Sequence, residues 1–84
     1  MYQIRIEPKA KKELKKIKNK RDIKRIYQVF LEIRKNPFLG KKLKGEFKGL
    51  YSFRIWPYRI VYKIYRQQIL VIVVRFGHRN RVYR

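Results

Sequence analysis

The last eight residues of the chain, GHRNRVYR, combine side chains that can bind and transform a phosphate ester. They include His78, the only histidine, together with Arg79, Arg81 and Tyr83. A guanidinium is planar, permanently charged and able to donate two hydrogen bonds to one phosphate, and a phenol can transfer a proton. These groups act together only if the fold brings them to one surface, so the preceding elements decide between a site and a basic tail.

The charge of the chain predicts a polyanionic partner. Its 84 residues contain 25 Lys and Arg against five Asp and Glu, which gives a formal net charge of +20. Five carboxylates pair only a minority of these cations, and their mutual repulsion disfavours the compact state unless an anion compensates it. Nucleic acid is the first candidate, and an acidic protein or an anionic membrane surface are the alternatives.

The acidic residues all lie in the first part of the sequence. Glu46 is the last of them, and nine basic residues but no side-chain carboxylate occur from Phe47 to Arg84. This half therefore cannot supply paired carboxylates for hydrolysis, a carboxylate-bound magnesium ion or a carboxylate-supported triad. One histidine and no cysteine also disfavour a zinc site. If the protein is an enzyme, we expect it to work without a metal or other cofactor.

The length of 84 residues predicts a single domain over residues 1–84, and hydrophobic periodicity predicts its elements. Residues 2–7 alternate as in a strand, Pro8 suits the first turn of a helix, and Asp22 is the expected N-cap of a second helix that ends before Pro37. Further strands are expected at residues 50–55, 58–65 and 69–76. The order β-α-α-β-β-β predicts an α+β fold in which two helices pack on one face of a small antiparallel sheet.

The second expected helix has an apolar stripe wider than one contact surface requires. The stripe consists of Ile23, Ile26, Tyr27, Val29, Phe30, Leu31 and Ile33. Our preferred interpretation is packing against both the sheet and the first helix, and a docking surface for a partner is the alternative.

Neither a signal peptide nor a membrane span is predicted. The N-terminus lacks the apolar run of a secretory signal, and no segment approaches about 18 consecutive apolar residues. The absence of cysteine agrees with a reducing compartment. We therefore expect a soluble cytoplasmic protein that does not act at a membrane.

Strand alternation predicts that the arginines gather on the face of the sheet that the helices leave open. Arg54 and Arg59 point away from the apolar residues of their strands. One parity of the last strand is shared by Val71, Val73, Arg75, Arg79, Arg81 and Tyr83, provided that the chain stays extended. A bulge at Gly77 would reset this register.

Such a face has the chemistry needed to cleave RNA. The ribose 2′-oxygen attacks the adjacent phosphorus, and Arg54, Arg59 and Arg79 would hold the phosphate and stabilise the added charge. Tyrosine has a reference pKa of about 10, so Tyr83 would act as a base only if neighbouring cations lower its pKa. The RNA backbone would be bound by Lys41, Lys42, Lys44, Lys48, His78 and Arg81. Solvated arginines on exposed strands and a packing role for Tyr83 are the plain alternatives.

Two stretches, KLKGEFKGLYSFRIWPYRIVYKI at residues 42–64 and VVRFGHRNRVYR at residues 73–84, resemble the RelE/ParE toxin superfamily and most closely its RelE-like ribonuclease branch. The resemblance implies a toxin of a toxin–antitoxin pair, neutralised by an acidic antitoxin. It implies metal-independent cleavage of mRNA in the ribosomal A site. It assigns the family's basic and tyrosine residues to Arg54, Arg59, Arg79 and Tyr83.

The chain departs from the RelE-like pattern on the strand before Arg59. The best-known ribonucleases of this branch carry two lysines there, whereas this chain has Ser52 and Arg54. Lys44 or Lys48 are candidates to replace the missing lysine. ParE-like members share the fold but poison DNA gyrase, and they generally lack the near-terminal tyrosine. A gyrase poison and an inactive nucleic-acid-binding module are therefore the alternatives to a ribonuclease.

Overall fold

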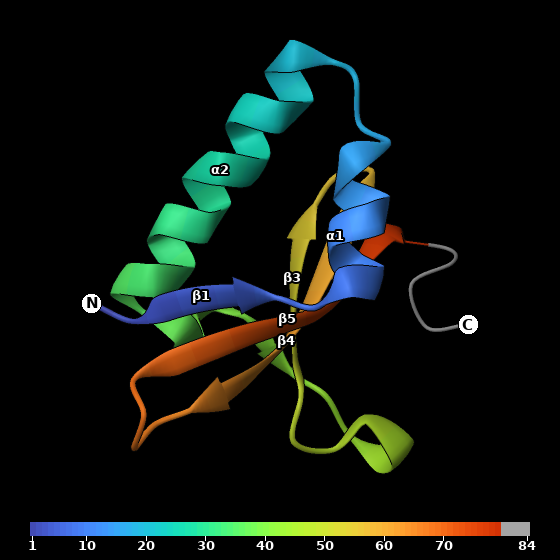
Figure 1. The fold of residues 1–84 in the computed structure, drawn as a ribbon. Helices are drawn as coiled ribbons and strands as arrows, with labels where there is room; N and C mark the ends of the chain where they lie inside the picture. Colours follow the sequence, from blue (N-terminus) through green and yellow to red (C-terminus); the bar gives the residue numbers. More distant parts are fainter. Residues whose placement is uncertain (80–84) are drawn as a thin grey trace.

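The computed structural model describes residues 1–79, and the expected α+β fold is confirmed in them (Figure 1). Both helices pack against one face of a five-stranded sheet. The elements are β1 (Gln3–Ile6), α1 (Pro8–Lys15), α2 (Lys20–Lys35), β2 (Lys41–Lys42), β3 (Tyr51–Ile55), β4 (Tyr58–Tyr65) and β5 (Leu70–His78), with 3₁₀ turns at Pro37–Leu39 and Gly45–Phe47. Within residues 1–79, neither helix has the length and apolar character needed to cross a membrane.

The sheet is mixed, which corrects the expectation of an antiparallel sheet. Its strand order is β1-β5-β4-β3-β2, and β1 runs parallel to β5 while the other neighbouring strands are antiparallel. Parallel neighbours require a crossover connection, and both helices lie between β1 and β5 in the sequence. The alternation of residues 2–7 predicts a strand but carries no information about the direction of its pairing.

A β-bulge in β5 corrects the expected parity of the last strand. Tyr62 pairs with Val73, but the preceding residue, Val61, pairs with Arg75, so Val74 is an extra residue at this point. A bulge turns the side chains that follow it to the other face of the sheet. Val73 is therefore buried under the helices, whereas Arg75 lies on the opposite face.

The bulge lies beside the end of β1. β1 ends beside Val73, where the Glu7 N–H donates to the Val73 carbonyl oxygen at 3.0 Å, and α1 then begins. The bulge thus lies where β5 loses its parallel neighbour. Gly77, the expected position of a register change, pairs regularly with Arg59.

The core fills the space between the helices and one face of the sheet, which we call the helix face. Its buried side chains are Ala10, Ile26, Phe30, Ile33, Ile55, Ile60, Tyr62, Val71, Val73 and Phe76. The other face, which we call the open face, carries Lys41, Ser52, Arg54, Arg59, Val61, Lys63 and Arg75. The division follows from strand alternation, because cross-strand partners point to the same face of a sheet.

α2 begins before the expected cap. Its N-cap is Asn19, whose side-chain oxygen accepts hydrogen bonds from the N–H groups of Arg21 at 2.9 Å and Asp22 at 3.1 Å. Asp22 instead lies in the first turn, where a negative charge interacts favourably with the helix dipole. Asn and Asp are equally good caps, so the sequence allowed both positions.

Candidate nucleic-acid interface

The centre of the open face is a row formed by three neighbouring strands. Arg54 on β3 lies directly opposite Arg59 on β4, which lies opposite Gly77 on β5. Like charges on directly opposed strand positions destabilise a sheet. Gly77 has no side chain, and a Cβ at this position would lie 4.0 Å from Glu13 Oε2 of α1. An anion between these strands would relieve the repulsion, so the row has the character of an anion-binding site.

A hollow of about 440 Å³ adjoins this row. It is lined by Leu39, Gly40, Lys41, Leu43, Ser52, Phe53, Arg54 and Arg59. Lys41 on β2 pairs with Ser52 on β3, so its side chain lies on the same face as the arginines. The hollow therefore combines a lysine and two arginines with a hydroxyl group.

Tyr62 fixes the basic loop that forms one wall of the hollow. Its hydroxyl donates to the Pro37 carbonyl oxygen at 2.7 Å and accepts a hydrogen bond from the Gly40 N–H at 3.1 Å. Burial raises the pKa of Tyr62 to about 12, because the neutral phenol is favoured in the core. A Cβ at Gly40 would overlap the Tyr62 hydroxyl and lie 2.9 Å from the Ser52 carbonyl oxygen, so only glycine allows this close approach.

Arg79 is held at the open face by the β3–β4 turn. Its N–H donates to the Pro57 carbonyl oxygen at 3.0 Å, and its guanidinium carbon lies 4.2 Å from the centre of the Trp56 ring. The peptide bond between Trp56 and Pro57 is cis. The structure therefore brings Arg79 to the end of the sheet where Arg54 and Arg59 lie, as expected from the sequence.

The four predicted loop lysines do not share one surface. Lys41 lies on the open face, whereas Lys42 pairs with Tyr51 and points to the side of the helices. Lys44 and Lys48 are exposed and flank the short 3₁₀ turn at Gly45–Phe47. Of these lysines, Lys41 is the one that the strand register places beside the arginine row.

His78 is separated from the arginine row. It pairs with Tyr58 on the helix face, and the two rings make an edge-to-face contact with centroids 5.5 Å apart. The Tyr58 hydroxyl donates to Asp22 Oδ2 at 3.1 Å. Burial, followed by the interaction with Asp22, raises the pKa of Tyr58. These contacts favour a packing role for His78, while Arg81 and Tyr83 lie outside the described residues.

Sequence reasoning missed one contributor to the open face, Trp56. It placed Arg75 on this face together with Val71 and Val73, and the bulge at Val74 leaves Arg75 there while the two valines are buried on the helix face. Trp56 was regarded as part of a turn, although it is 53% exposed beside Arg79. The available signal was a single tryptophan in a short hairpin turn between two arginine-bearing strands.

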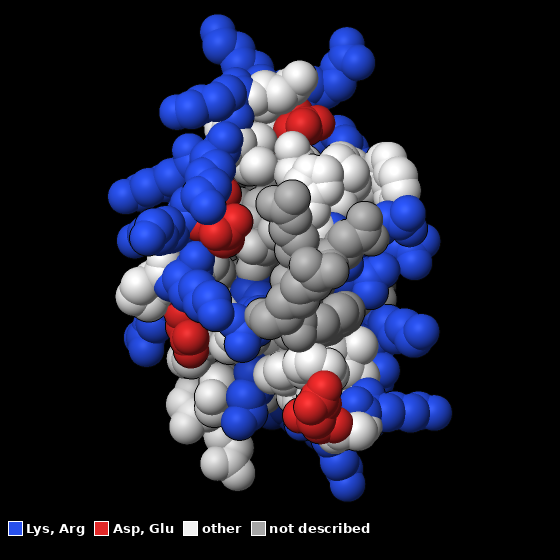
Figure 2. Space-filling view, turned by 90° about the vertical axis from the view of Figure 1, so that its right-hand side faces the viewer, with Lys and Arg blue, Asp and Glu red and all other residues white. Residues whose placement is uncertain are grey.

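The acidic groups belong to the helices and the loop, and Glu13 comes near the arginine row, because its Oε2 lies 4.0 Å from the position that a Cβ of Gly77 would occupy. Glu7, Glu13, Asp22 and Glu32 belong to α1, α2 and the N-cap of α1, and Glu46 lies in the 3₁₀ turn at Gly45–Phe47. Within residues 1–79, no three His, Asp or Glu side chains come together as a metal site would require. Figure 2 shows lysine and arginine side chains spread over much of one side of the molecule, with few acidic groups between them.

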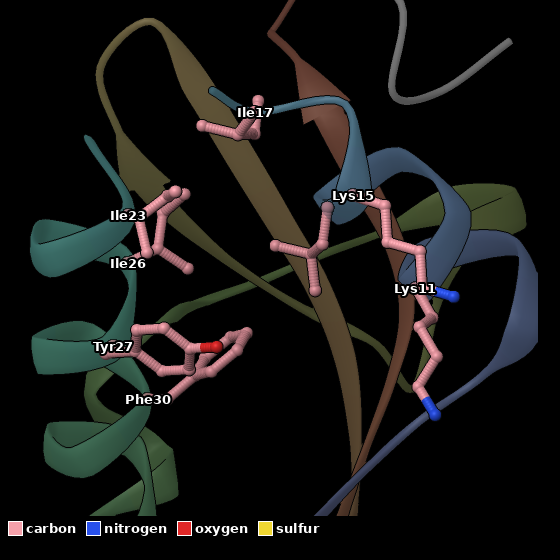
Figure 3. Close-up of a pocket in the computed structure, with 8 residues that line it drawn as sticks. Lys11, Lys15, Ile17, Ile23, Ile26, Tyr27 and Phe30 are labelled. Atoms are coloured by element: carbon pink, nitrogen blue, oxygen red, sulfur yellow. The ribbon is translucent and has the colours of Figure 1, made fainter. Parts of the chain in front are cut away.

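A second surface feature is an apolar groove of about 290 Å³ between α1 and α2. It is lined by Lys11, Leu14, Lys15, Ile17, Ile23, Ile26, Tyr27 and Phe30 (Figure 3). The packing interpretation accounts for Ile26, Phe30 and Ile33, which are buried. It does not account for Tyr27 and Leu31, which are 66% and 44% exposed.

Known proteins share this sequence pattern and this fold. A family model described as the ParE toxin of the type II toxin–antitoxin system parDE matches residues 4–83. Toxin RelG of Mycobacterium tuberculosis (strain ATCC 25618 / H37Rv) is 29% identical over 84 residues, which cover 99% of this chain and 97% of the relative.

Two solved toxin–antitoxin complexes have the same toxin fold. The RelBE2 complex of Mycobacterium tuberculosis aligns with a TM-score of 0.70 and 28% identity, covering 93% of this chain and 91% of the other. The archaeal RelE–RelB complex of Pyrococcus horikoshii aligns with a TM-score of 0.80 and 21% identity, covering 96% and 98%. Because the family model spans nearly the whole sequence, this chain belongs to the ParE toxin family, within the RelE/ParE superfamily of type II toxin–antitoxin systems.

Proposed function

We propose that this toxin is a metal-independent endoribonuclease that cleaves mRNA in the A site of the ribosome. The observation that carries the proposal is the open face, where Arg54 and Arg59 lie directly opposite each other beside Lys41. Arg79 is held at the same end of the sheet by Trp56 and Pro57. The sequence from Phe47 to Arg84 contains no side-chain carboxylate that would compete with a phosphate for these cations.

The proposed reaction is an internal phosphoryl transfer. The 2′-oxygen of one ribose attacks the adjacent phosphorus, the bond from phosphorus to the 5′-oxygen breaks, and a 2′,3′-cyclic phosphate and a 5′-hydroxyl are formed. Arg59 and Arg79 would stabilise the charge of the phosphorane, and Arg54 would bind the phosphate. Tyr83 would transfer a proton from the 2′-hydroxyl or to the leaving oxygen.

Lys41 is our candidate to replace the lysine that RelE-like ribonucleases carry at the position of Ser52. The two residues are cross-strand partners on the open face, and both line the hollow. Lys44 and Lys48, the replacements considered from the sequence, lie farther along the loop around the 3₁₀ turn. Lys41 would therefore add a positive charge beside the scissile phosphate.

Cleavage is tested on ribosomes programmed with a defined mRNA, with EDTA present. We expect breaks in the A-site codon that persist under chelation and are lost with Arg79→Ala. Arg66→Ala is the matched control, since this exposed arginine lies in the β4–β5 turn, away from the arginine row. Full cleavage by Arg79→Ala would contradict the proposal, and so would loss of cleavage on chelation under conditions in which the programmed ribosomes stay assembled.

DNA gyrase is the second candidate target, because the matching family model is that of the ParE toxin. A gyrase poison would leave mRNA intact on the ribosome and would trap gyrase on cleaved DNA. Assays of both targets with the same protein preparation distinguish the two functions. Salt-sensitive nucleic-acid binding with neither effect would indicate an inactive binding module.

The groove between α1 and α2 fits the partner expected of such a toxin. We propose that it binds an apolar helix face of an acidic antitoxin. Lys11 and Lys15 line one side of the groove, while Ile23 and Tyr27 line the other (Figure 3). An amphipathic acidic helix would cover the apolar side chains and pair with the lysines, and the net charge of +20 favours such a partner. The complexes of the solved relatives with RelB support an antitoxin as the occupant.

A pair of synthetic helical peptides tests the groove. One carries an acidic face and an apolar face, and the other has the same composition in scrambled order. We expect the amphipathic peptide to bind more tightly, and Tyr27→Glu to weaken this binding while cleavage by the free toxin persists. Equal binding of both peptides, or unchanged binding by Tyr27→Glu, would argue against this occupant.

A further inference from the structure

We propose that Trp56 is a stacking platform for an unpaired base of the RNA whose phosphate lies between Arg54 and Arg59. This inference rests on the proposed function, because it adds a base-binding position to the same face. Tryptophan is on average one of the more buried residues, yet Trp56 is 53% exposed. It directly follows β3, two residues after Arg54, in the turn that joins the two strands of the arginine row.

Arg79 covers part of the indole without occupying all of it. Its guanidinium carbon is 4.2 Å from the ring centre, which is the distance of a close cation–π contact. More than half of the Trp56 surface is still exposed, so ring area remains for a second planar group. A flat aromatic surface beside fixed cations is the arrangement by which proteins bind single-stranded nucleic acid.

The stacked guanidinium can serve the base and the phosphate at once. Its carbon lies 4.2 Å from the ring centre, and a guanidinium carries five N–H donors, so donors remain for a phosphate beside the ring contact. The hydrogen bond from the Arg79 N–H to the Pro57 carbonyl oxygen, 3.0 Å long, fixes the backbone of this residue to the turn. Trp56 and Arg79 therefore form one unit in which the ring receives a base and the guanidinium edge receives a phosphate.

Intrinsic fluorescence reports directly on this contact, because Trp56 is the only tryptophan of the chain. The probes are a short single-stranded RNA and an abasic oligonucleotide with the same number of phosphates. Binding is followed by anisotropy of a label on each probe, and stacking by quenching of Trp56. We expect both probes to bind at low salt and the RNA to quench much more strongly. Equal quenching by the two probes, or no RNA binding at low salt, would overturn the inference.

Substitution separates stacking from the positioning of Arg79. Trp56→Leu is expected to weaken RNA binding about tenfold, the lower part of the range for loss of one base–aromatic stack. It should change binding of the abasic probe much less, and Trp56→Phe should keep part of the RNA affinity. If Trp56 only positions Arg79, Trp56→Leu will lower the affinity for both probes equally. That result would contradict a base-stacking role for Trp56.

Phe38→Leu is the matched control. Like Trp56, Phe38 is an exposed aromatic residue, with 45% of its surface exposed, and the guanidinium carbon of Arg66 lies 5.7 Å from its ring centre. Unlike Trp56, it contacts Tyr51 on the helix face. We expect Phe38→Leu to bind both probes as the unchanged protein does. A loss of RNA affinity equal to that of Trp56→Leu would show that the effect is not specific to Trp56 and would overturn the inference.

The platform and the nuclease can fail separately. One outcome is quenching of Trp56 by the RNA but not by the abasic probe, in a protein that leaves mRNA intact on the ribosome. This result would support the base-stacking role of Trp56 and reject the nuclease. Cleavage on the ribosome together with normal RNA binding by Trp56→Leu would keep the nuclease and reject the platform.

Discussion

The two faces of the sheet are built from the same strands but carry different side chains, apolar on the helix face and largely cationic on the open face. On the helix face, Ile60 and Tyr62 of β4 are fully buried beneath α1 and α2. The same strand carries Arg59 and Lys63 on the open face, opposite the face that α1 and α2 cover. Apolar burial on one side stabilises the fold, and this allows the other side to hold repelling charges together. Most of the core packing and the row of positive charge are thus carried by residues that point to opposite faces of the same strands.

Arg59 gives the largest expected effect on the open face. Arg59→Ala should lower the rate of mRNA cleavage on the ribosome about 100-fold, the size of effect found when one donor to a developing charge is removed. Arg59→Lys keeps the charge but loses the planar pair of N–H donors, so only part of the rate should return. The measurement is single-turnover cleavage, with thermal unfolding of each variant as the control for folding. A variant that unfolds at the usual temperature and still cleaves at the full rate would remove Arg59 from the site.

The helix face should respond through stability. Tyr62→Phe removes the hydroxyl that bonds to Pro37 and Gly40, and we expect a loss of about 2 kcal/mol in the free energy of unfolding, because a buried partner is left unsatisfied. Gly40→Ala should cost about 1–3 kcal/mol, because its Cβ would force the loop away from Tyr62. Urea unfolding measures both changes. If both variants are as stable as the parent protein, the loop is not anchored by this contact.

The same tyrosine gives the helix face a pH dependence. The pKa of Tyr62 is about 12 in the folded protein, above the value of about 10 for an unfolded chain. The contribution of the neutral phenol is therefore complete below pH 10 and is lost as the pH rises toward 12. The stability difference between the parent and Tyr62→Phe should fall by about 1.4 kcal/mol per pH unit above pH 10. A difference that stays constant over this interval would contradict the raised pKa.

The sequence predicted the two faces better than it predicted the last strand. Alternation placed Arg54 and Arg59 correctly, because each lies in a regular strand with apolar neighbours on both sides. It failed at Val74, since the run ILVIVV is apolar at every position and cannot show where a bulge changes the parity. The parallel pairing of β1 with β5 was not predicted either, because the alternation of one strand does not show which strand it pairs with or in which direction.

The candidate site was also only partly readable from the sequence. Arg79 was predicted on the open face by an argument that counted it with Val73, and the bulge separates these two residues. His78 belongs by its pairing to the opposite face. Trp56 became visible as a site residue only when the fold placed Arg79 over its ring, because no local pattern joins residues so far apart in sequence.

Lys41 and Lys42 give the smallest and most selective test, because they are adjacent, exposed and of opposite orientation in β2. Lys41 shares the open face with Ser52, whereas Lys42 is the partner of Tyr51 on the side of the helices. Each alanine substitution removes one positive charge, so a purely diffuse field would make the two variants equal. If Lys41 contacts a phosphate, Lys41→Ala should reduce the slope of log affinity against log salt by about 0.7, the value for one contact with single-stranded nucleic acid. Lys42→Ala should change this slope less. Equal slopes for the two variants in a salt titration would mean that affinity depends on the total charge of the loop and not on the face to which each lysine points.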